Sequence, residues 1–355
     1  MTIHLLSGFL GSGKTTAIEQ ACKYLINSGR SVGVISNDQG AQLVDGAFFN
    51  YHNIPNRQVI NGCFCCNYQD FENSVAALVE VNRPDVIFAE SVGSCTDIVA
   101  TVIKPLLKYT QNKTVTLSTF ADIRLLHMLL KGNGSAFHES VGYIYFKQLE
   151  EASIIIVTKV DLADEQLLTE VKQIVAERYS EKLFLFQNSR DPADIKSWLD
   201  ILDTTAEASK LGSLQIDYAT YGEGEAQLAW FDQEIDIYSA ENASQDAVRI
   251  IQAICDKIGD SKSPVGHLKF LIDGKTKISF TRISDKHDLD DLHLEKKLYT
   301  KLLINARVQT TPEMLSALIN EAVQGVRSAL GCFVIVKSTA SFQPGFPKPT
   351  HRILA

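Results

Sequence analysis

Residues 8–16 read G-F-L-G-S-G-K-T-T, which fits the phosphate-binding pattern G-x-x-x-x-G-K-[ST]. An apolar run at residues 3–6 precedes the glycines and predicts a strand, and residues 15–26 after them predict a helix. A strand, a glycine-rich loop and a helix in this order give the pattern its structural meaning. Backbone N–H groups of such a loop, together with the helix N-terminus, bind the phosphates of a nucleotide.

Two residues of this loop have individual expected roles. We expect Lys14 to reach the β- and γ-phosphates and the Thr15 hydroxyl to bind Mg²⁺, which makes both residues candidates for catalysis. The full candidate set for binding the nucleotide here is Gly8, Gly11, Ser12, Gly13, Lys14, Thr15 and Thr16.

The composition excludes several classes of protein. The chain has 355 residues, 45% of them hydrophobic, which suggests two domains with ordinary cores. Its formal net charge is −8 and it has no block of Lys and Arg, so nucleic acid is not an expected partner. No apolar run approaches the roughly 18 residues of a membrane span. The first expected strand begins at Thr2, which leaves no room for a signal peptide, so we expect a cytoplasmic protein.

Residues 1–205 alternate short apolar runs with helical runs. This pattern predicts an α/β domain with a doubly wound, mainly parallel sheet. The expected strands after the first are residues 31–36, 85–89, 115–120, 153–158 and 183–186. The expected helices after the first are residues 71–81, 95–108, 165–176 and 193–202.

The pattern changes after residue 205. Residues 206–225 are rich in Ala, Ser, Gly and acidic residues and predict a linker. Residues 226–343 predict a smaller α+β C-terminal domain, with a hairpin about Asp273-Gly274. Residues 344–355 are proline-rich and predict an irregular tail.

Residues 85–93 read D-V-I-F-A-E-S-V-G and place an acid at the end of an apolar strand. Glu90, next to the phosphate-binding loop, could bind Mg²⁺ or its water and is a candidate catalytic residue. Gly93 would bring its backbone N–H close to the γ-phosphate. An ordinary glutamate at a strand end is the alternative interpretation.

Residues 158–161 read T-K-V-D and resemble the base-recognition motif [N/T]-K-x-D. The Asp161 carboxylate would accept hydrogen bonds from guanine N1–H and its amino group, which adenine does not offer, so GTP is favoured. Lys159 would pack along the base, and Thr158 stands where Asn is usual. Ser189, after the last expected strand, would complete the base pocket. A turn with incidental charges is the alternative.

The chain has seven cysteines, an odd number that argues against a disulfide framework. Cys63, Cys65 and Cys66 lie within four positions and offer thiolates to Zn²⁺ first, and also to Cu(I), Co²⁺, Ni²⁺ or Fe²⁺. Three such thiolates cannot surround an ion without distortion. A fourth ligand or a second chain, in a homodimer, is therefore expected, as in a transferable site. Cys95 is a candidate, and a set of buried small residues is the alternative.

Together these segments resemble the CobW-like GTPases, which are relatives of the UreG and HypB metallochaperones. The matching segments occur in family order, from the phosphate-binding loop through V-I-S-N-D-Q-G, N-G-C-F-C-C, E-S-V-G and T-K-V-D. They cover about residues 1–200. Residues 266–270 (G-H-L-K-F) and 303–308 (L-I-N-A-R-V) are similar to the accessory domain of that family.

The resemblance implies a Mg²⁺-dependent GTPase that delivers a metal to a client metalloenzyme or serves a corrinoid (cobalamin) pathway. It places Asp38 at the switch I acid, a catalytic and Mg²⁺-binding position, and assigns the metal to Cys63, Cys65 and Cys66. Slow GTP turnover is expected, because no Gln or Arg can be assigned to orient water. Two alternatives stay open: a G-protein chaperone of a corrinoid enzyme whose thiols bind no metal, and a P-loop kinase.

Overall fold

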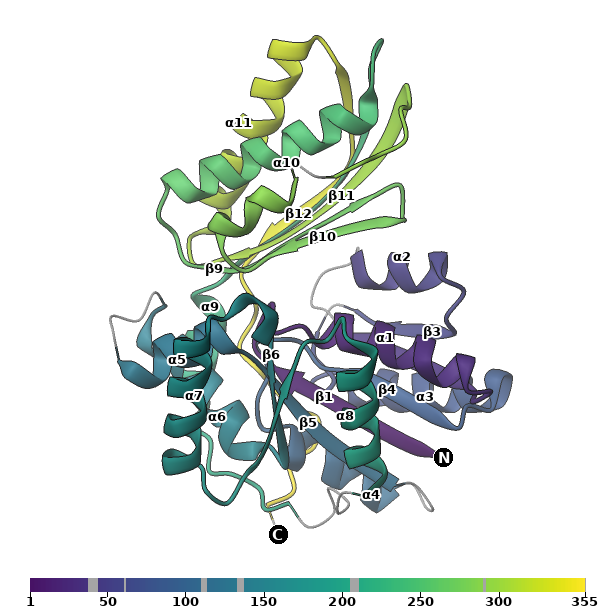
Figure 1. Cartoon of the computed structure of the whole chain (residues 1–355), viewed down its shortest axis with the longest axis vertical. Helices are drawn as coiled ribbons and strands as arrows, with labels where there is room; N and C mark the ends of the chain where they lie inside the picture. Colours follow the sequence, from purple (N-terminus) through teal and green to yellow (C-terminus); the bar gives the residue numbers. More distant parts are fainter. Residues whose placement is uncertain are drawn as a thin grey trace. The chain divides into compact units, whose positions relative to one another are not determined.

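The structure is a computed structural model of the chain (Figure 1). It describes residues 1–37, 44–60, 62–109, 114–132, 137–204, 211–289 and 292–354. Contacts divide these residues into two units, each with its own sheet. Apart from the gaps, the first unit contains residues 1–37, 52–224 and 347–354, and the second contains residues 44–51 and 225–346.

A seven-stranded parallel sheet forms the centre of the first unit, in the order β3-β2-β4-β1-β5-β6-β7. Because β1 lies inside the sheet, with strands on both sides of it, the doubly wound α/β fold is confirmed. Most strands are buried on both faces, which explains their continuous apolar runs. The strands are β1 (Thr2–Gly8), β2 (Val32–Asn37), β3 (Asn56–Val59), β4 (Val86–Glu90), β5 (Thr114–Asp122), β6 (Ile154–Thr158) and β7 (Leu183–Gln187).

Helices flank this sheet, with α1 packed on α8 and α5 packed on α7 (Figure 1). The parallel strands all end at the same edge, so the loops that follow them come together there. The helices are α1 (Lys14–Asn27), α3 (Tyr68–Asn82), α4 (Lys104–Tyr109), α5 (Ile123–Lys131), α6 (Glu139–Glu151), α7 (Glu165–Arg178), α8 (Pro192–Thr204) and α9 (Tyr218–Ala226), with the short helices η1 (Val99–Ile103) and η2 (Val160–Leu162).

Two local predictions are wrong. The helix expected over residues 95–108 begins later, with the π-helical η1, because Asp97 has a left-handed backbone (φ 63°) that a helix does not tolerate. Residues 91–97 instead form a loop after β4. Helix α9 forms where a linker was expected, and the hydroxyls of Tyr218 and Tyr221 fix it by hydrogen bonds to Asp97 and Thr96.

The second unit is α+β, as predicted, with an antiparallel sheet in the order β10-β9-β11-β8-β12. Helices α10 and α11 pack together and on the sheet, over a core of alternating apolar residues. The hairpin at Asp273-Gly274 is confirmed, with both residues at positive φ (52° and 70°). The elements are α2 (Val44–Tyr51), β8 (Ala229–Tyr238), α10 (Ala243–Asp260), β9 (Val265–Ile272), β10 (Thr276–Phe280), η4 (Ile283–Leu289), β11 (Tyr299–Val308), α11 (Pro312–Leu330) and β12 (Phe333–Phe342).

Helix α2 belongs to this second unit although it lies between β2 and β3 in sequence. Asp45 forms ion pairs with Lys269 (2.6 Å) and Lys277. Burial raises the pKa of the Asp45 carboxyl, but the two lysines outweigh it and hold that pKa well below its usual range. The chain segment that directly follows residues 38–43 is therefore anchored to the C-terminal sheet.

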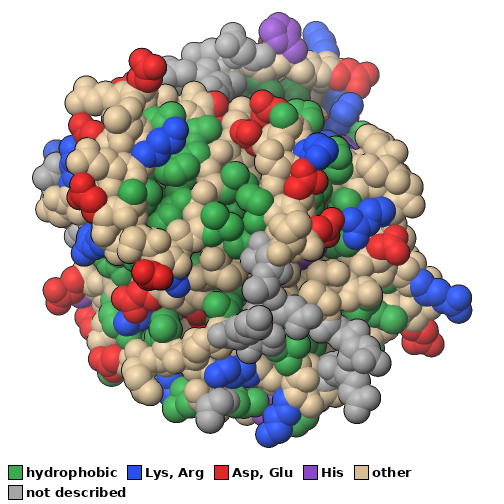
Figure 2. Space-filling view, turned by 60° about the horizontal axis from the view of Figure 1, so that its bottom comes forward, with side chains coloured by type: hydrophobic (Ala, Val, Ile, Leu, Met, Phe, Trp, Pro, Cys, Tyr) green, Lys and Arg blue, Asp and Glu red, His purple; other side chains and the backbone are tan. Residues whose placement is uncertain are grey.

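The surface has no continuous basic patch on the face that Figure 2 shows, where Lys and Arg side chains lie singly among acidic ones. Among the described residues, no helix combines the length and the apolar character needed to cross a membrane.

A candidate nucleotide and metal site

The glycine-rich loop after β1 has the backbone of a phosphate cradle. Gly8, Gly11 and Gly13 have φ of 126°, 69° and 92°, conformations that favour glycine. A Cβ on Gly8 would lie 2.2 Å from the carbonyl oxygen of Phe120, so no side chain fits there. Helix α1 starts directly after the loop, and its first turn contains no acidic residue that would repel an anion. The residues present therefore fit a bound triphosphate.

Thr15 and Glu90 meet beside this cradle. The Thr15 hydroxyl donates to both carboxylate oxygens of Glu90, at 3.0 Å each, and both residues are buried. They meet because β1 and β4 are parallel neighbours with Leu6 opposite Glu90. Hydroxyl and carboxylate oxygens are the ligands that Mg²⁺ prefers, so this pair fits the ion. Lys14 is buried and donates to the Gly8 carbonyl oxygen at 2.6 Å, folded back over the loop.

Gly93 lies against the phosphate cradle. A Cβ at this position would come within 2.8 Å of the Leu10 backbone nitrogen, so the close approach requires glycine. Gln148 on α6 donates through its side-chain nitrogen to the carbonyl oxygens of Gly93 (3.0 Å) and Cys95 (2.8 Å). One side chain thus holds the middle of loop 91–97.

The predicted base-recognition residues lie at the end of β6 and just after β6 and β7, which are neighbouring strands. The Thr158 hydroxyl donates to the Ser12 carbonyl oxygen at 2.7 Å and so ties this region to the phosphate loop. Lys159 has a left-handed backbone (φ 59°), and Asp161 in η2 is exposed. Ser189 is buried and accepts a hydrogen bond from Gln187 at 3.0 Å.

Asp122, at the end of β5, is a residue that sequence reasoning missed. Its carboxylate binds Lys159 at 2.9 Å and Arg124 at 3.1 Å. Burial raises the pKa of the Asp122 carboxyl, but these two cations outweigh it and leave that pKa well below its usual range. The ionised Asp122 therefore orients Lys159. The only signal in the sequence was an acid after an expected strand, as for Glu90.

The three predicted cysteines come together on the loop between β3 and α3. Their sulfur atoms all lie within 4.8 Å of one another, and those of Cys65 and Cys66 are 3.8 Å apart. A tight turn, in which the backbone N–H groups of Cys66 and Asn67 donate to the Cys63 carbonyl oxygen, gathers the thiols. Cys63 and Cys65 are buried and Cys66 is half-buried. The set is therefore accessible from one side.

One thiol of the cluster is prepared to act as a thiolate. Hydrogen bonds from the thiols of Cys65, Cys66 and Cys95 lower the pKa of Cys63 well below its ordinary value. The hydrogen bond to Cys63, together with burial, raises the pKa of Cys65 well above its ordinary value and that of Cys66 to about 11. The thiolate is the metal-binding form of cysteine, so a thiol with a lowered pKa favours metal binding by this cluster.

Asn37, the last residue of β2, fixes the cysteine loop to the sheet. Its side-chain nitrogen donates to the carbonyl oxygens of Val59 (2.9 Å) and Gly62 (2.7 Å), and its side-chain oxygen accepts from the Phe64 N–H (2.8 Å). Asn37 is directly followed by Asp38, the predicted switch I acid, which lies outside the described residues. One buried amide therefore connects the start of that segment to the thiols.

Residues 347–354 lie along the cysteine loop, although the sequence predicts only an irregular tail. The Lys348 N–H donates to the Cys66 sulfur at 3.3 Å. The Thr350 N–H and hydroxyl donate to the carbonyl oxygens of Cys65 (2.8 Å) and Cys66 (2.9 Å). Arg352 then binds the fully buried Asp97 at 2.7 Å. This tail contains no helix or strand, but hydrogen bonds fix it to two loops of the site.

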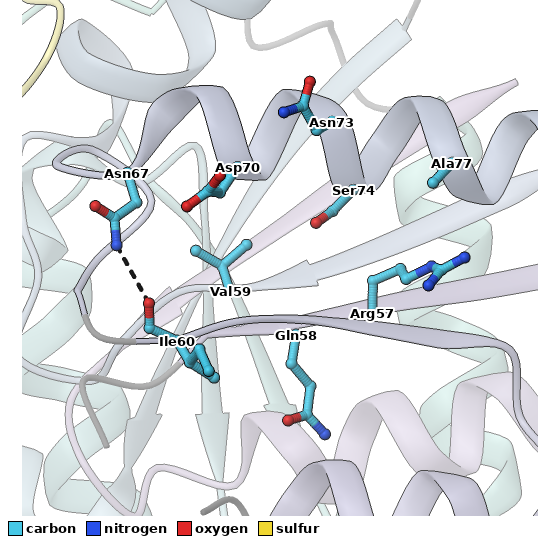
Figure 3. A pocket seen from close by; sticks show the side chains of 9 residues that line it. All are labelled: Arg57, Gln58, Val59, Ile60, Asn67, Asp70, Asn73, Ser74 and Ala77. Atoms are coloured by element: carbon cyan, nitrogen blue, oxygen red, sulfur yellow. Dashed lines mark hydrogen bonds between the residues drawn. The ribbon is translucent and has the colours of Figure 1, made fainter. Parts of the chain in front are cut away.

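An open groove of about 630 Å³ lies beside the same loop, between β3 and α3 (Figure 3). Its lining is mostly polar and includes Arg57, Asp70 and Asn73. The Asn67 side chain closes one end by donating to the Ile60 carbonyl oxygen at 3.2 Å.

The fold and the cradle define a P-loop nucleotide-binding protein. Residues 2–186 match the family model described as the CobW/HypB/UreG nucleotide-binding domain, and the chain belongs to this family.

Comparisons with single proteins are more distant. The chain is 29% identical over 200 residues to a zinc chaperone CobW from Sinorhizobium sp, covering 50% of this chain and 56% of that protein. It is 29% identical over 100 residues to the zinc chaperone YjiA of Escherichia coli (strain K12), covering 27% and 30%. The chain thus matches about half or less of the length of these relatives. HypB from Helicobacter pylori, solved in complex with nickel, matches with a TM-score of 0.43 and 16% identity, covering 60% of this chain and 91% of that one.

Proposed function

We propose that this protein is a Mg²⁺-dependent GTPase that carries a thiophilic transition metal, Zn²⁺ first, to a client protein. The observation that carries the proposal is the convergence of Cys63, Cys65 and Cys66 within 4.8 Å, on a loop held by the last residue of β2. The family membership and the two curated zinc chaperones support this reading.

The nucleotide end of the proposal rests on the residues around the cradle. Lys14 would leave the loop carbonyls for the β- and γ-phosphates. Thr15, Glu90 and Asp38 would hold Mg²⁺ directly or through water, and the ion would neutralise charge on the transferring phosphoryl group. Asp161 would select guanine, with Lys159 oriented by Asp122 and Ser189 closing the pocket. No side chain in the described residues is assigned to orient water, so we expect slow hydrolysis.

The affinity of the thiol site for metal would depend on the bound nucleotide through Asn37. The predicted switch I acid Asp38 directly follows Asn37, and the γ-phosphate would hold a switch segment there. Movement there would shift the amide that binds Gly62 and Phe64, and with it the thiols. Metal would then change nucleotide affinity by the same factor as nucleotide changes metal affinity.

A metal titration tests the proposal. Zn²⁺ would be titrated into the reduced wild type and into a variant with Cys63, Cys65 and Cys66 changed to Ala, each with GDP and with a non-hydrolysable GTP analogue. Cys255→Ala, a buried cysteine of α10, is the matched control. We expect a site in the wild type and in the control, absent from the triple variant, whose affinity depends on the nucleotide.

Other outcomes would point elsewhere. Equal Zn²⁺ binding by the triple variant would overturn the metal proposal and favour the corrinoid-enzyme chaperone, which uses GTP but no thiol-bound metal. Tighter binding of ATP than of GTP would favour the kinase. Equal affinity with both nucleotides would leave a metal-binding GTPase and remove the coupling.

A further inference from the structure

Cys95 reaches the thiol cluster from a different element of the fold. It lies in loop 91–97, two residues after Gly93, and its side chain is buried with 2% exposure. Its thiol makes hydrogen bonds with the thiols of both Cys63 and Cys65. Cys63 and Cys65 therefore each contact Cys66 from their own loop and Cys95 from the loop after β4.

These contacts approach the arrangement of a four-thiolate site. Zinc–sulfur bonds of about 2.3 Å place the sulfurs of a tetrahedral site about 3.8 Å apart. The Cys65 and Cys66 sulfurs already have this separation, at 3.8 Å. Cys63 and Cys65 each contact all the other thiols of the set. A tetrahedron would need the Cys95 sulfur to close around the ion with the other three, which already lie within 4.8 Å of one another.

We propose that Cys95 is the fourth ligand of the transferable metal and that loop 91–97 opens or closes the coordination sphere with the nucleotide state. This inference rests on the proposed function above. Each thiol that binds the ion releases its proton to solvent, and no redox step is involved. With Cys95 bound the site is closed, and with Cys95 withdrawn it keeps an open position that a client ligand can enter.

The loop has the connections that such a gate requires. At one end, Glu90 binds Thr15 and Gly93 contacts Leu10 of the phosphate cradle. Gln148 binds the carbonyl oxygens of both Gly93 and Cys95, so these residues move together. A γ-phosphate bound by the Gly93 N–H would hold Cys95 in the site, and hydrolysis would release it. The GTP state would then store the metal and the GDP state would deliver it.

Packing alone would also bury a cysteine, because free cysteines behave as small apolar residues. Cys255 is such a case, with 0% exposure inside the core of the second unit. Cys95 differs because its neighbours are two other thiols next to the half-buried Cys66. This difference can be measured.

Cobalt spectroscopy tests the assignment. Co²⁺ would be titrated into the reduced full chain, as wild type, Cys95→Ala, Cys95→Ser and the control Cys255→Ala, with a non-hydrolysable GTP analogue. The intensity of the sulfur-to-cobalt charge-transfer band increases with the number of bound thiolates. We expect both Cys95 variants to lose about a quarter of it, and to bind Zn²⁺ at least about tenfold more weakly in competition with a chelator.

A cobalt band and a Zn²⁺ affinity unchanged in both Cys95 variants would overturn the inference. The proposed function would survive that result, provided that the Cys63, Cys65 and Cys66 variant still loses the metal. The two failures are therefore distinguishable.

X-ray absorption on the zinc-loaded wild type needs no variant and covers the case in which Cys95→Ala does not fold. We expect about four sulfur neighbours with the GTP analogue and about three with GDP. Four in both states would keep Cys95 as a ligand and overturn the gating. Three in both states would overturn the whole inference.

Discussion

Thr15 and Glu90 are 75 positions apart in the sequence and share two hydrogen bonds in the structure. The single hydroxyl of Thr15 donates to both oxygens of the buried Glu90 carboxylate. A doubly charged cation bound between them would stabilise that carboxylate more than one shared hydrogen bond does. At this scale, one oxygen atom can decide whether a side chain binds a cation or accepts a hydrogen bond from a base.

Changing Glu90 to Gln replaces one carboxylate oxygen by an amide nitrogen, which cannot bind a cation. We expect the variant to fold, because the remaining oxygen still accepts from Thr15. We expect GTP hydrolysis to fall by about a hundredfold and to need more Mg²⁺. Steady-state hydrolysis against Mg²⁺ concentration is the measurement, with the exposed Glu177→Gln as control. An unchanged Mg²⁺ requirement would remove Glu90 from the site.

Changing Asp161 to Asn turns two acceptor oxygens into one acceptor and one donor. Guanine then loses a hydrogen-bond acceptor, and we expect GTP binding to weaken by about a hundredfold. Xanthine has a carbonyl oxygen where guanine has its amino group, so we expect the variant to bind XTP better than GTP. Competition between the two nucleotides is the measurement. A variant that keeps the wild-type preference would show that Asp161 does not read the base.

At the scale of elements, three loops hold the candidate nucleotide and metal residues. The cysteine loop, loop 91–97 and the phosphate cradle come from three different places in the sequence. The first two are each fixed by one side-chain amide that binds backbone groups, Asn37 for the cysteine loop and Gln148 for loop 91–97. Removing such an amide leaves buried backbone groups without partners, which is costly.

Asn37→Ala tests the first of these connections. The change leaves the carbonyl oxygens of Val59 and Gly62 and the N–H of Phe64 without their partner. We expect the free energy of unfolding to fall by about 2 kcal/mol and Zn²⁺ affinity to lose part of its dependence on nucleotide. Urea denaturation and the zinc titration measure the two effects, with the exposed Asn73→Ala on α3 as control. A destabilised variant with unchanged nucleotide dependence would limit Asn37 to a structural role.

Sequence motifs predicted the positions of single residues in this site better than the hydrogen bonds and ion pairs between distant segments. Gly8, Lys14 and Glu90 could be placed from the sequence, because a strand, a loop and a helix in order fix their local geometry. Asn37, Asp122 and Arg352 could not, because their partners are distant in the sequence and no local pattern marks them. The late start of the helix after β4 was missed for the same reason, since Asp97 takes its backbone conformation from tertiary contacts.

At the scale of the whole molecule, the free energy of unfolding should depend on pH. Glu151, at the end of α6, is buried and accepts a hydrogen bond from the Val99 N–H at 2.5 Å. Burial raises the pKa of its carboxyl from 4.5 to about 8, despite the N–H groups that lower it. The folded protein therefore keeps this proton where the unfolded chain loses it.

We expect the free energy of unfolding to fall as pH rises between about 4.5 and 8, because the folded state binds one more proton there. The full effect is on the order of 5 kcal/mol. Glu151→Gln keeps the oxygen that accepts from Val99 and has no proton to lose. Its stability should therefore change less over this range and exceed that of the wild type at pH 8. Parallel slopes of unfolding free energy against pH for the two proteins would contradict the assignment.

Arg352 and its neighbours have a practical consequence for anyone who handles the protein. Because the Lys348 and Thr350 backbone and side-chain groups donate hydrogen bonds to Cys65 and Cys66, a change in residues 348–352, near this end of the chain, alters the surroundings of the thiol cluster. A histidine-rich purification tag at that end would add imidazoles that compete for the same ions. Measured metal preference would then report the tag as much as the protein. The same contacts make residues 348–352 a place where metal affinity can be altered without changing a cysteine.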